Sequence, residues 1–174
     1  YHKDASTIQE KTADANTVPS ILDKQRLVLT TATKILTTRG PDKGFVSEPE
    51  TGLVIASESV VAHDMISLAW LIKNRAALSE REKKLFRDTY KSQFLVNNVN
   101  RLVVGLLGGL TEVWDTEKLV RNDLSAIWDD RVLSRAFEVF GGVPRVTLVD
   151  EGNTVPSTIK NELTRMVVRS VLRA

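Results

Sequence analysis

A short apolar run leads directly into an amphipathic helical pattern in this chain. Residues 52–57 read GLVIAS, a continuous apolar stretch between Gly and Ser, which predicts a central strand buried on both faces. Soon after it, apolar residues recur at i, i+4, i+7, i+8 and i+11: Val61, Met65, Leu68, Ala69 and Ile72. This stripe predicts a helix with one buried face, and Ser57 or Ser59 can cap its start.

Two further segments have the composition of strands. RLVLTTATKIL at 26–36 is rich in β-branched residues, which favours a strand or a strand pair over the weaker alternative of a helix. RVTLV at 145–149 follows Pro144 and predicts another strand.

Three more helical patterns follow the first one. Ser79 and Glu82 have the spacing of a capping box, which predicts that a helix begins there. IWDDRVLSRAFEVFGG at 127–142 predicts a helix closed by one of its two final glycines. The last pattern begins at Pro156, a residue that suits the first helical position. Its apolar residues are Ile159, Leu163, Met166, Val167 and Val171.

The alternation of strands and helices predicts an α/β fold, with a small mixed sheet flanked by helices. Residues 1–17 are polar and are predicted to form a flexible lead-in, whereas 18–174 has the length of a single domain. Within that domain, about 78–125 is predicted to be a helical insertion. The large aromatic residues of the helical part are predicted to belong to the core: Trp114, Trp128, Phe137 and Phe140.

Charge and cysteine content exclude several classes of protein. The chain has 24 Lys and Arg against 22 Asp and Glu, and the two signs are interspersed, so we expect no nucleic-acid binding. No cysteine occurs, which excludes a Cys-ligated zinc ion or iron–sulfur cluster held by this chain alone.

Hydropathy and the start of the chain bear on its location. The longest apolar run, LVVGLLGGL at 102–110, is about half the ~20 residues that a membrane-spanning helix needs, so we expect no membrane span. The chain starts at Tyr1 without Met or a signal pattern, and we expect it to be a segment of a longer protein. A cytoplasmic location is the corresponding expectation.

The glycine-rich loop at 38–51 is the first candidate for a binding site. A Walker-type loop places Lys and then Ser or Thr after its last Gly, but Gly44 is followed here by Phe45. The loop also precedes a strand, so it lacks the helix dipole that favours an anion. Alone, it is better explained as a Pro-Asp turn with Gly44 at positive φ.

The pair His63-Asp64 falls on the predicted helix at 61–72. A metal-dependent phosphohydrolase has such a doublet together with further ligands, but the only other histidine is His2, in the polar lead-in. Neighbours on a helix point about 100° apart, so the doublet alone cannot hold an ion, and we expect no metal site and a satisfied, partly buried His63.

Asp64 follows a strand in an α/β pattern, a place where ligands collect. Its carboxylate can bind a ligand hydroxyl or act as a base. The alternative is that a negative charge near a helix start is simply favourable.

Eight residues between 26 and 70 recur in the order and spacing of a known pattern: Gly40, Pro41, Gly44, Ala56, Ser57, Val61, Ala62 and Asp64. With them, this segment resembles the domain-of-unknown-function family 362, an uncharacterised group often joined to ferredoxin-type cluster domains. RVLSRAFEVFGGVPRVTLV at 131–149 is similar to the closing helix and strand of that family. Thr31 and Ser59-Val60 depart from it, because the family has an acidic residue and Asp-Pro there.

The resemblance implies a small-ligand-binding part of a redox-associated enzyme with a ferredoxin-type partner; the cofactor and reaction are unknown. Asp64 would be the best candidate for a catalytic residue. The residues expected near a small anionic or polar ligand are Arg39, Gly40, Lys43, Gly44, Ser57 and Asp64. The alternative is a non-catalytic interaction or assembly domain, in which the insertion with LVVGLLGGL supplies a partner-binding or homo-oligomer face.

Overall fold

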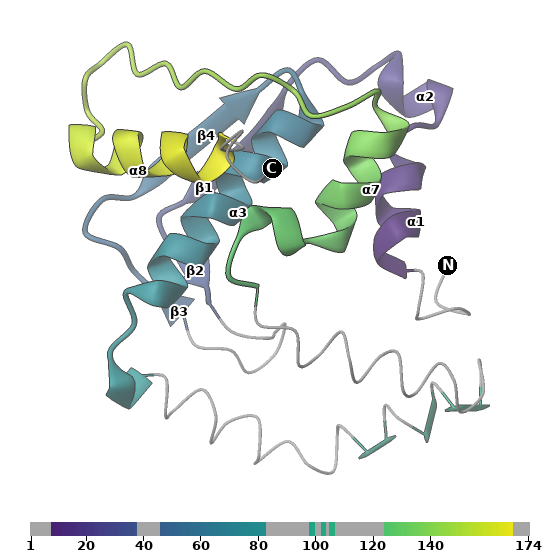
Figure 1. The fold of residues 1–174 in the computed structure, drawn as a ribbon, viewed down its shortest axis with the longest axis horizontal. Helices are drawn as coiled ribbons and strands as arrows, with labels where there is room; N and C mark the ends of the chain where they lie inside the picture. Colours follow the sequence, from purple (N-terminus) through teal and green to yellow (C-terminus); the bar gives the residue numbers. More distant parts are fainter. Residues whose placement is uncertain are drawn as a thin grey trace, which may run out of the picture.

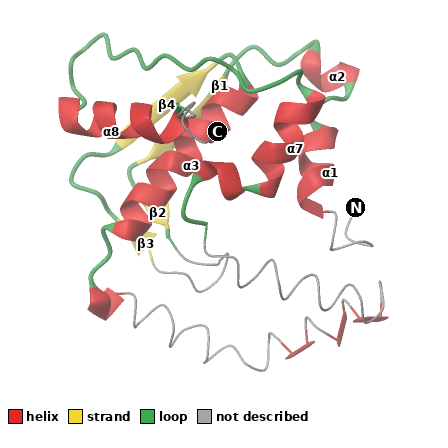
Figure 2. Cartoon of the chain, in the orientation of Figure 1, coloured by secondary structure: helices red, strands yellow, loops and turns green. Residues whose placement is uncertain are grey.

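The computed structural model describes residues 8–37, 46–82, 98–99, 102–103, 105–106 and 124–168. The strands are β1 (Val28–Ala32), β2 (Ile35–Leu36), β3 (Val46–Ser47) and β4 (Leu53–Ser57). The helices are α1 (Ile8–Ala15), α2 (Pro19–Leu22), α3 (Val60–Ala76), the 3-10 helix η2 (Ile127–Asp129), α7 (Arg131–Val139) and α8 (Ser157–Val167). Figures 1 and 2 show these helices around a few short strands, which confirms the predicted α/β class.

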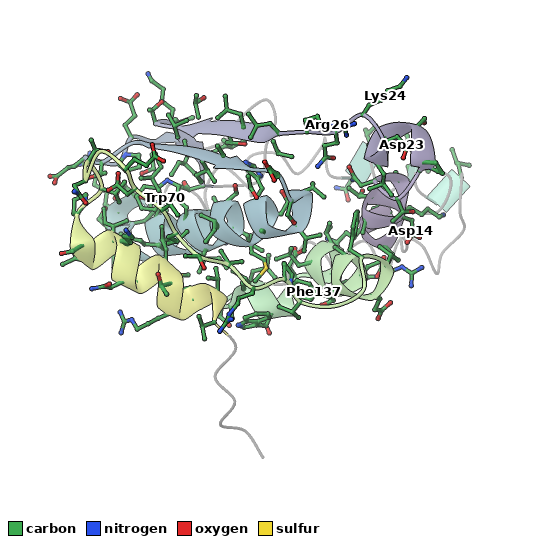
Figure 3. The ribbon with its side chains drawn as sticks, turned by 90° about the horizontal axis from the view of Figure 1, so that it is seen from above. Asp14, Asp23, Lys24, Arg26, Trp70 and Phe137 are labelled. Carbon is green, nitrogen blue, oxygen red and sulfur yellow. The ribbon has the colours of Figure 1, made fainter. Side chains whose placement is uncertain are left out.

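The elements form layers with α3 in the middle. Figure 3 shows strands β1 and β4 on one side of α3, with α7 and α8 on the other. Helix α1 lies next to α7, at the end of the molecule away from α8 (Figure 1). Helix α3 is therefore the element that both outer layers share.

The strands pair antiparallel in two small sheets. β1 pairs with β4, with Leu29 opposite Ala56 and Thr31 opposite Val54, and β2 pairs with β3. Two strands are thus present in 26–36, one of the predicted alternatives.

Strand β4 is not the central strand, buried on both faces, that GLVIAS predicts. Leu53 and Ile55 are buried, whereas Val54 between them is 66% exposed. The reason is that β4 belongs to a two-stranded sheet whose described helices cover one face only. An unbroken apolar run does not show whether a second layer covers the other face of the strand.

The strand predicted at 145–149 is wrong. Among the described residues this segment is extended without pairing to any strand. Val146 and Leu148 pack against the core while Arg145 and Val149 face outward. The alternation in the sequence reflects an extended chain lying along the core, and it does not require a sheet.

Helix α3 begins as predicted, with Ser59 at its N-cap. The Ser59 Oγ accepts a hydrogen bond from the amide of Ala62 at 3.2 Å. Met65 and Ala69 are wholly buried, and the Trp70 indole Nε1 donates to the Ala32 carbonyl of β1 at 3.4 Å. This hydrogen bond ties the middle of α3 to the sheet.

The predicted helix at 127–142 is split by Asp130. This residue caps α7, because its Oδ1 accepts from the amide of Leu133 at 2.8 Å, and the preceding turn is the 3-10 helix η2. Gly141 and Gly142 follow α7 at φ +85° and +125°, which confirms the predicted closure. Helix α8 begins one residue after Pro156.

Three of the four predicted core aromatics lie in the described residues. Trp128, Phe137 and Phe140 are partly buried and pack against the core, and the rings of Trp128 and Phe137 have centroids 5.9 Å apart. Figure 3 shows Phe137 on α7. Trp114 lies outside the described residues.

The sequence prediction of a flexible lead-in at 1–17 did not foresee helix α1. Within this polar segment α1 packs against α7 and buries Ala13. Its partners lie 121 positions away, so no local pattern announces the contact.

Most of the predicted insertion at about 78–125 lies outside the described residues. At its start the capping box is present, because the Glu82 carboxylate accepts from the Ser79 amide at 2.7 Å. Residues 98–99, 102–103 and 105–106 are helical.

Candidate functional site

The structure describes only part of the site that the sequence predicts. Arg39, Gly40, Lys43 and Gly44 lie outside the described residues. Ser57 ends strand β4, and Asp64 lies in the second turn of helix α3.

Ser57 takes part in the turn between β4 and α3. Its Oγ accepts a hydrogen bond from the Ser59 amide at 3.1 Å, just before Ser59 caps the helix. Both hydroxyl oxygens therefore stabilise the strand-to-helix connection. A ligand bound through the Ser57 oxygen has to share it with this turn.

His63 is more buried than predicted, with a 4% exposed side chain. Its Nδ1 lies 3.5 Å from Oδ1 of Asp64, and its buried Nε2 has no hydrogen-bond partner among the described residues. The sequence predicts a partly buried histidine whose hydrogen bonds are made. That prediction is wrong about the burial of His63 and about its Nε2. An unpaired buried nitrogen costs free energy, so this side chain is a weak point of the core.

The Asp64 carboxyl is 50% exposed and lies near the start of α7. Burial by surrounding protein raises the pKa of Asp64, and the negative charge of Asp130 raises it further. The contact with His63 acts in the opposite direction and only partly offsets the loss of hydration. Asp64 is therefore a carboxyl whose ionisation the fold disfavours.

The acidic groups of the described residues do not converge on a cation site. No group of three or more His, Cys, Asp or Glu side chains in the described part of the chain is arranged to hold a metal ion. Asp130 is also engaged in capping α7. Asp64 and His63 thus form a pair at a helix junction.

A shallow groove of about 520 Å³ runs between α1 and α7. The residues that line it are almost all charged: Glu10, Lys11, Asp14, Arg131, Ser134, Arg135 and Glu138. Pockets for small molecules are lined mostly by apolar and aromatic groups, so this lining is unusual for such a site.

Two arginines of α7 bind two carboxylates of α1 in this groove. Arg131 Nε donates to Glu10 Oε1 at 2.7 Å, and Arg135 Nε donates to Asp14 Oδ1 at 2.8 Å. The pKa of the Arg135 guanidinium is raised because Asp14, and then Glu138, accept its hydrogen bonds. The sequence contains one indication of these ion pairs. Glu10 and Asp14 are four residues apart, and so are Arg131 and Arg135.

Exposed apolar side chains gather at helical spacing in 99–106. Val99, Leu102, Val103 and Leu106 are 59%, 63%, 46% and 78% exposed. They fall at i, i+3, i+4 and i+7, so on a helix they share one face. A second exposed apolar pair, Leu29 and Val54, lies on the open face of β1 and β4.

Comparisons of the chain with protein-family models, curated proteins and solved structures found no match. The resemblance to family 362 therefore stays a prediction. No helix among the described residues has the length and apolar character to cross a membrane.

We expect Asp64→Asn to raise the melting temperature at neutral pH but not in acid. The raised pKa means that the native state holds the Asp64 proton more tightly than the unfolded chain does. Ionisation of Asp64 therefore lowers the free energy of unfolding as the pH rises from 3.8 through the raised pKa. Asparagine does not ionise, so it avoids this loss of free energy of unfolding at a pH above the raised pKa. Below pH 3.8 it brings no such advantage, because Asp64 is then protonated in both states.

Thermal melts of both proteins across this pH range provide the measurement. The difference in melting temperature should grow with pH and then level off. A difference of the same size at every pH would contradict the role of ionisation.

Proposed function

We propose that this chain is a non-catalytic interaction domain that binds a second copy of itself through the helical stripe at 99–106. The observation that supports the proposal is the exposure of Val99, Leu102, Val103 and Leu106 on one helical face. Each such side chain gains about 1.5–3 kcal/mol when it is fully buried, so the stripe favours a partner that covers it.

The spacing of the stripe suits an identical helix as the partner. Val99, Leu102 and Leu106 follow the alternating three- and four-residue steps of a coiled-coil seam. In the sequence, Leu95 continues this spacing one step upstream. Two copies related by a twofold axis place the same apolar seam on both sides of the contact, which closes the assembly as a dimer.

The charged groove and the engaged serine favour this proposal over a small-molecule site. The groove between α1 and α7 is lined by charged residues in place of the apolar and aromatic residues of such sites, and its arginines are already paired. The Ser57 oxygen is already bonded within its turn.

We expect the wild-type chain to form a dimer that Leu102→Lys with Leu106→Lys converts to a monomer. Two lysines on each copy place like charges in the seam and remove its apolar contacts. Size-exclusion chromatography with light scattering over a range of concentrations measures the mass. The matched control is Val149→Lys, at a residue 76% exposed on the extended segment before α8, which should leave the dimer intact.

Circular dichroism separates loss of association from loss of folding. The double variant should keep the helical signal of the isolated subunit while its mass halves. A wild type that stays monomeric at every concentration would contradict the proposal, and so would a dimer that the two lysines leave unchanged.

We propose small-ligand binding as a second candidate function, in line with the resemblance to family 362. The half-exposed Asp64, with its raised pKa, beside the buried His63, whose Nε2 has no partner among the described residues, is the observation that favours it. Perturbed carboxyls next to a histidine are common at functional sites. In this candidate, Arg39 and Lys43 bind the anionic part of the ligand, and a ferredoxin-type partner supplies electrons to a redox-associated enzyme.

We expect ribose 5-phosphate, as an anionic probe with hydroxyl groups, to raise the melting temperature of the wild type and not of Asp64→Ala. The reason is that the Asp64 carboxylate would accept from the hydroxyl groups. Glu58→Ala, at a neighbouring exposed acid, is the matched control and should respond like the wild type. An equal response of Asp64→Ala would exclude Asp64 from the site, and no response in any protein would count against this candidate.

A further inference from the structure

Among the described residues, helix α1 packs against α7 and makes two ion pairs with it. Only Ala13 of its residues is buried, and its main contact among the described elements is with α7. Figure 1 shows α1 at the edge of the molecule beside α7, and Figure 3 shows Asp14 on it. Of the side chains of α1, that of Ala13 is therefore the one fully removed from water, and the paired carboxylates lie beside it.

The charges of the two helices form a ladder with two rungs. Glu10 and Asp14 lie on one face of α1 because they are four residues apart, and Arg131 and Arg135 do so on α7. Each carboxylate accepts from the Nε of one arginine, at 2.7 Å for the first rung and 2.8 Å for the second. Because the two acids and the two arginines are each four residues apart, both ion pairs form at the same relative position of the helices.

A neighbouring acid on α7 also orients the arginine of the second rung, which is the Arg135–Asp14 pair. Glu138 Oε2 accepts from Nη1 of Arg135 at 2.9 Å, which leaves Nε directed at Asp14. The two arginine side chains are 38% exposed, and those of Glu10 and Asp14 are 30% and 42% exposed. Both rungs are part-buried, and salt and competing carboxylates weaken them through their exposed part.

We propose that the Arg131–Arg135 face of α7 is a docking site for an acidic helix of a partner protein, which α1 occupies until the partner displaces it. The partner helix carries two carboxylates four residues apart, as in Glu10-Lys-Thr-Ala13-Asp14. A small residue stands one position before the second acid, where Ala13 is buried. Charge complementarity selects this class of partner, because arginine pairs bind carboxylates with defined geometry.

Helix α1 then acts as a built-in competitor. It is joined to β1 by the short segment from 16 to 27, so its effective concentration near α7 is high. A partner binds when it offers more contacts than α1 does. This inference is independent of the self-association proposed for 99–106, because the two surfaces share no residue.

The test uses a fluorescent peptide with the sequence of residues 5–17, ASTIQEKTADANT, and the full chain. Glu10→Lys with Asp14→Lys removes both carboxylates from α1 and opens the arginine face. We expect this variant to bind the peptide about tenfold more tightly than the wild type does, as measured by fluorescence anisotropy. Added KCl should weaken the binding, because the two pairs are exposed to water.

A reversed peptide, with Lys at the positions of Glu10 and Asp14, is the matched control. It should not bind the opened variant. The full chain with Arg131→Glu and Arg135→Glu should show the opposite preference and bind the reversed peptide. Equal binding of the native peptide to wild type and opened variant would overturn the proposal, and so would binding of both peptides to one protein.

Two further measurements keep the proposal falsifiable if a variant folds poorly. Circular dichroism checks the opened variant, and Glu10→Gln with Asp14→Asn replaces it where the lysines unfold the chain, with the same order of affinities expected. A wild-type dimer that the α1 substitutions abolish would instead show exchange of α1 between copies and would overturn the partner assignment.

Discussion

Burial of α3 between the sheet and the helices α7 and α8 is the interaction on which the rest of the structure depends. Met65 and Ala69 of α3 are wholly buried, and α3 lies between the sheet layer and the helical layer (Figure 3). The Trp70 indole adds a directed contact, because its hydrogen bond to the Ala32 carbonyl fixes α3 along β1. A two-stranded sheet is marginal on its own, so β1 and β4 keep their pairing because α3 covers one face of them.

Elements farther from α3 present charged or apolar side chains at the surface. Helix α1 makes two part-buried ion pairs with α7, and Val99, Leu102, Val103 and Leu106 present apolar side chains to water. A well-packed middle with adaptable outer surfaces suits a protein that works by binding other chains. The charge-lined groove and the apolar stripe would then select different partners, one by its carboxylates and the other by its apolar seam.

Local patterns predicted the elements whose causes are local. Ser59 at the start of α3 and the closing glycines of α7 were recognisable because cap and helix are adjacent in sequence. Two predictions were wrong, namely burial of the second face of β4 and strand pairing at 145–149. Both features depend on whether a distant layer is present. Helix α1 was missed for the same reason, since its arginine partners lie 121 positions away. For the site, sequence reasoning singled out Asp64, but it did not foresee the burial that raises its pKa or the smaller effect of the Asp130 charge.

Hydrogen–deuterium exchange measured peptide by peptide tests most directly the claim that packing on α3 holds the middle while charge holds α1. The amides of α3 should be the slowest to exchange, and added KCl should leave them unchanged. The amides of α1 should exchange faster and should speed up further as KCl screens the pairs of Glu10 and Asp14. Protection of α1 that equals that of α3 and resists KCl would contradict the account.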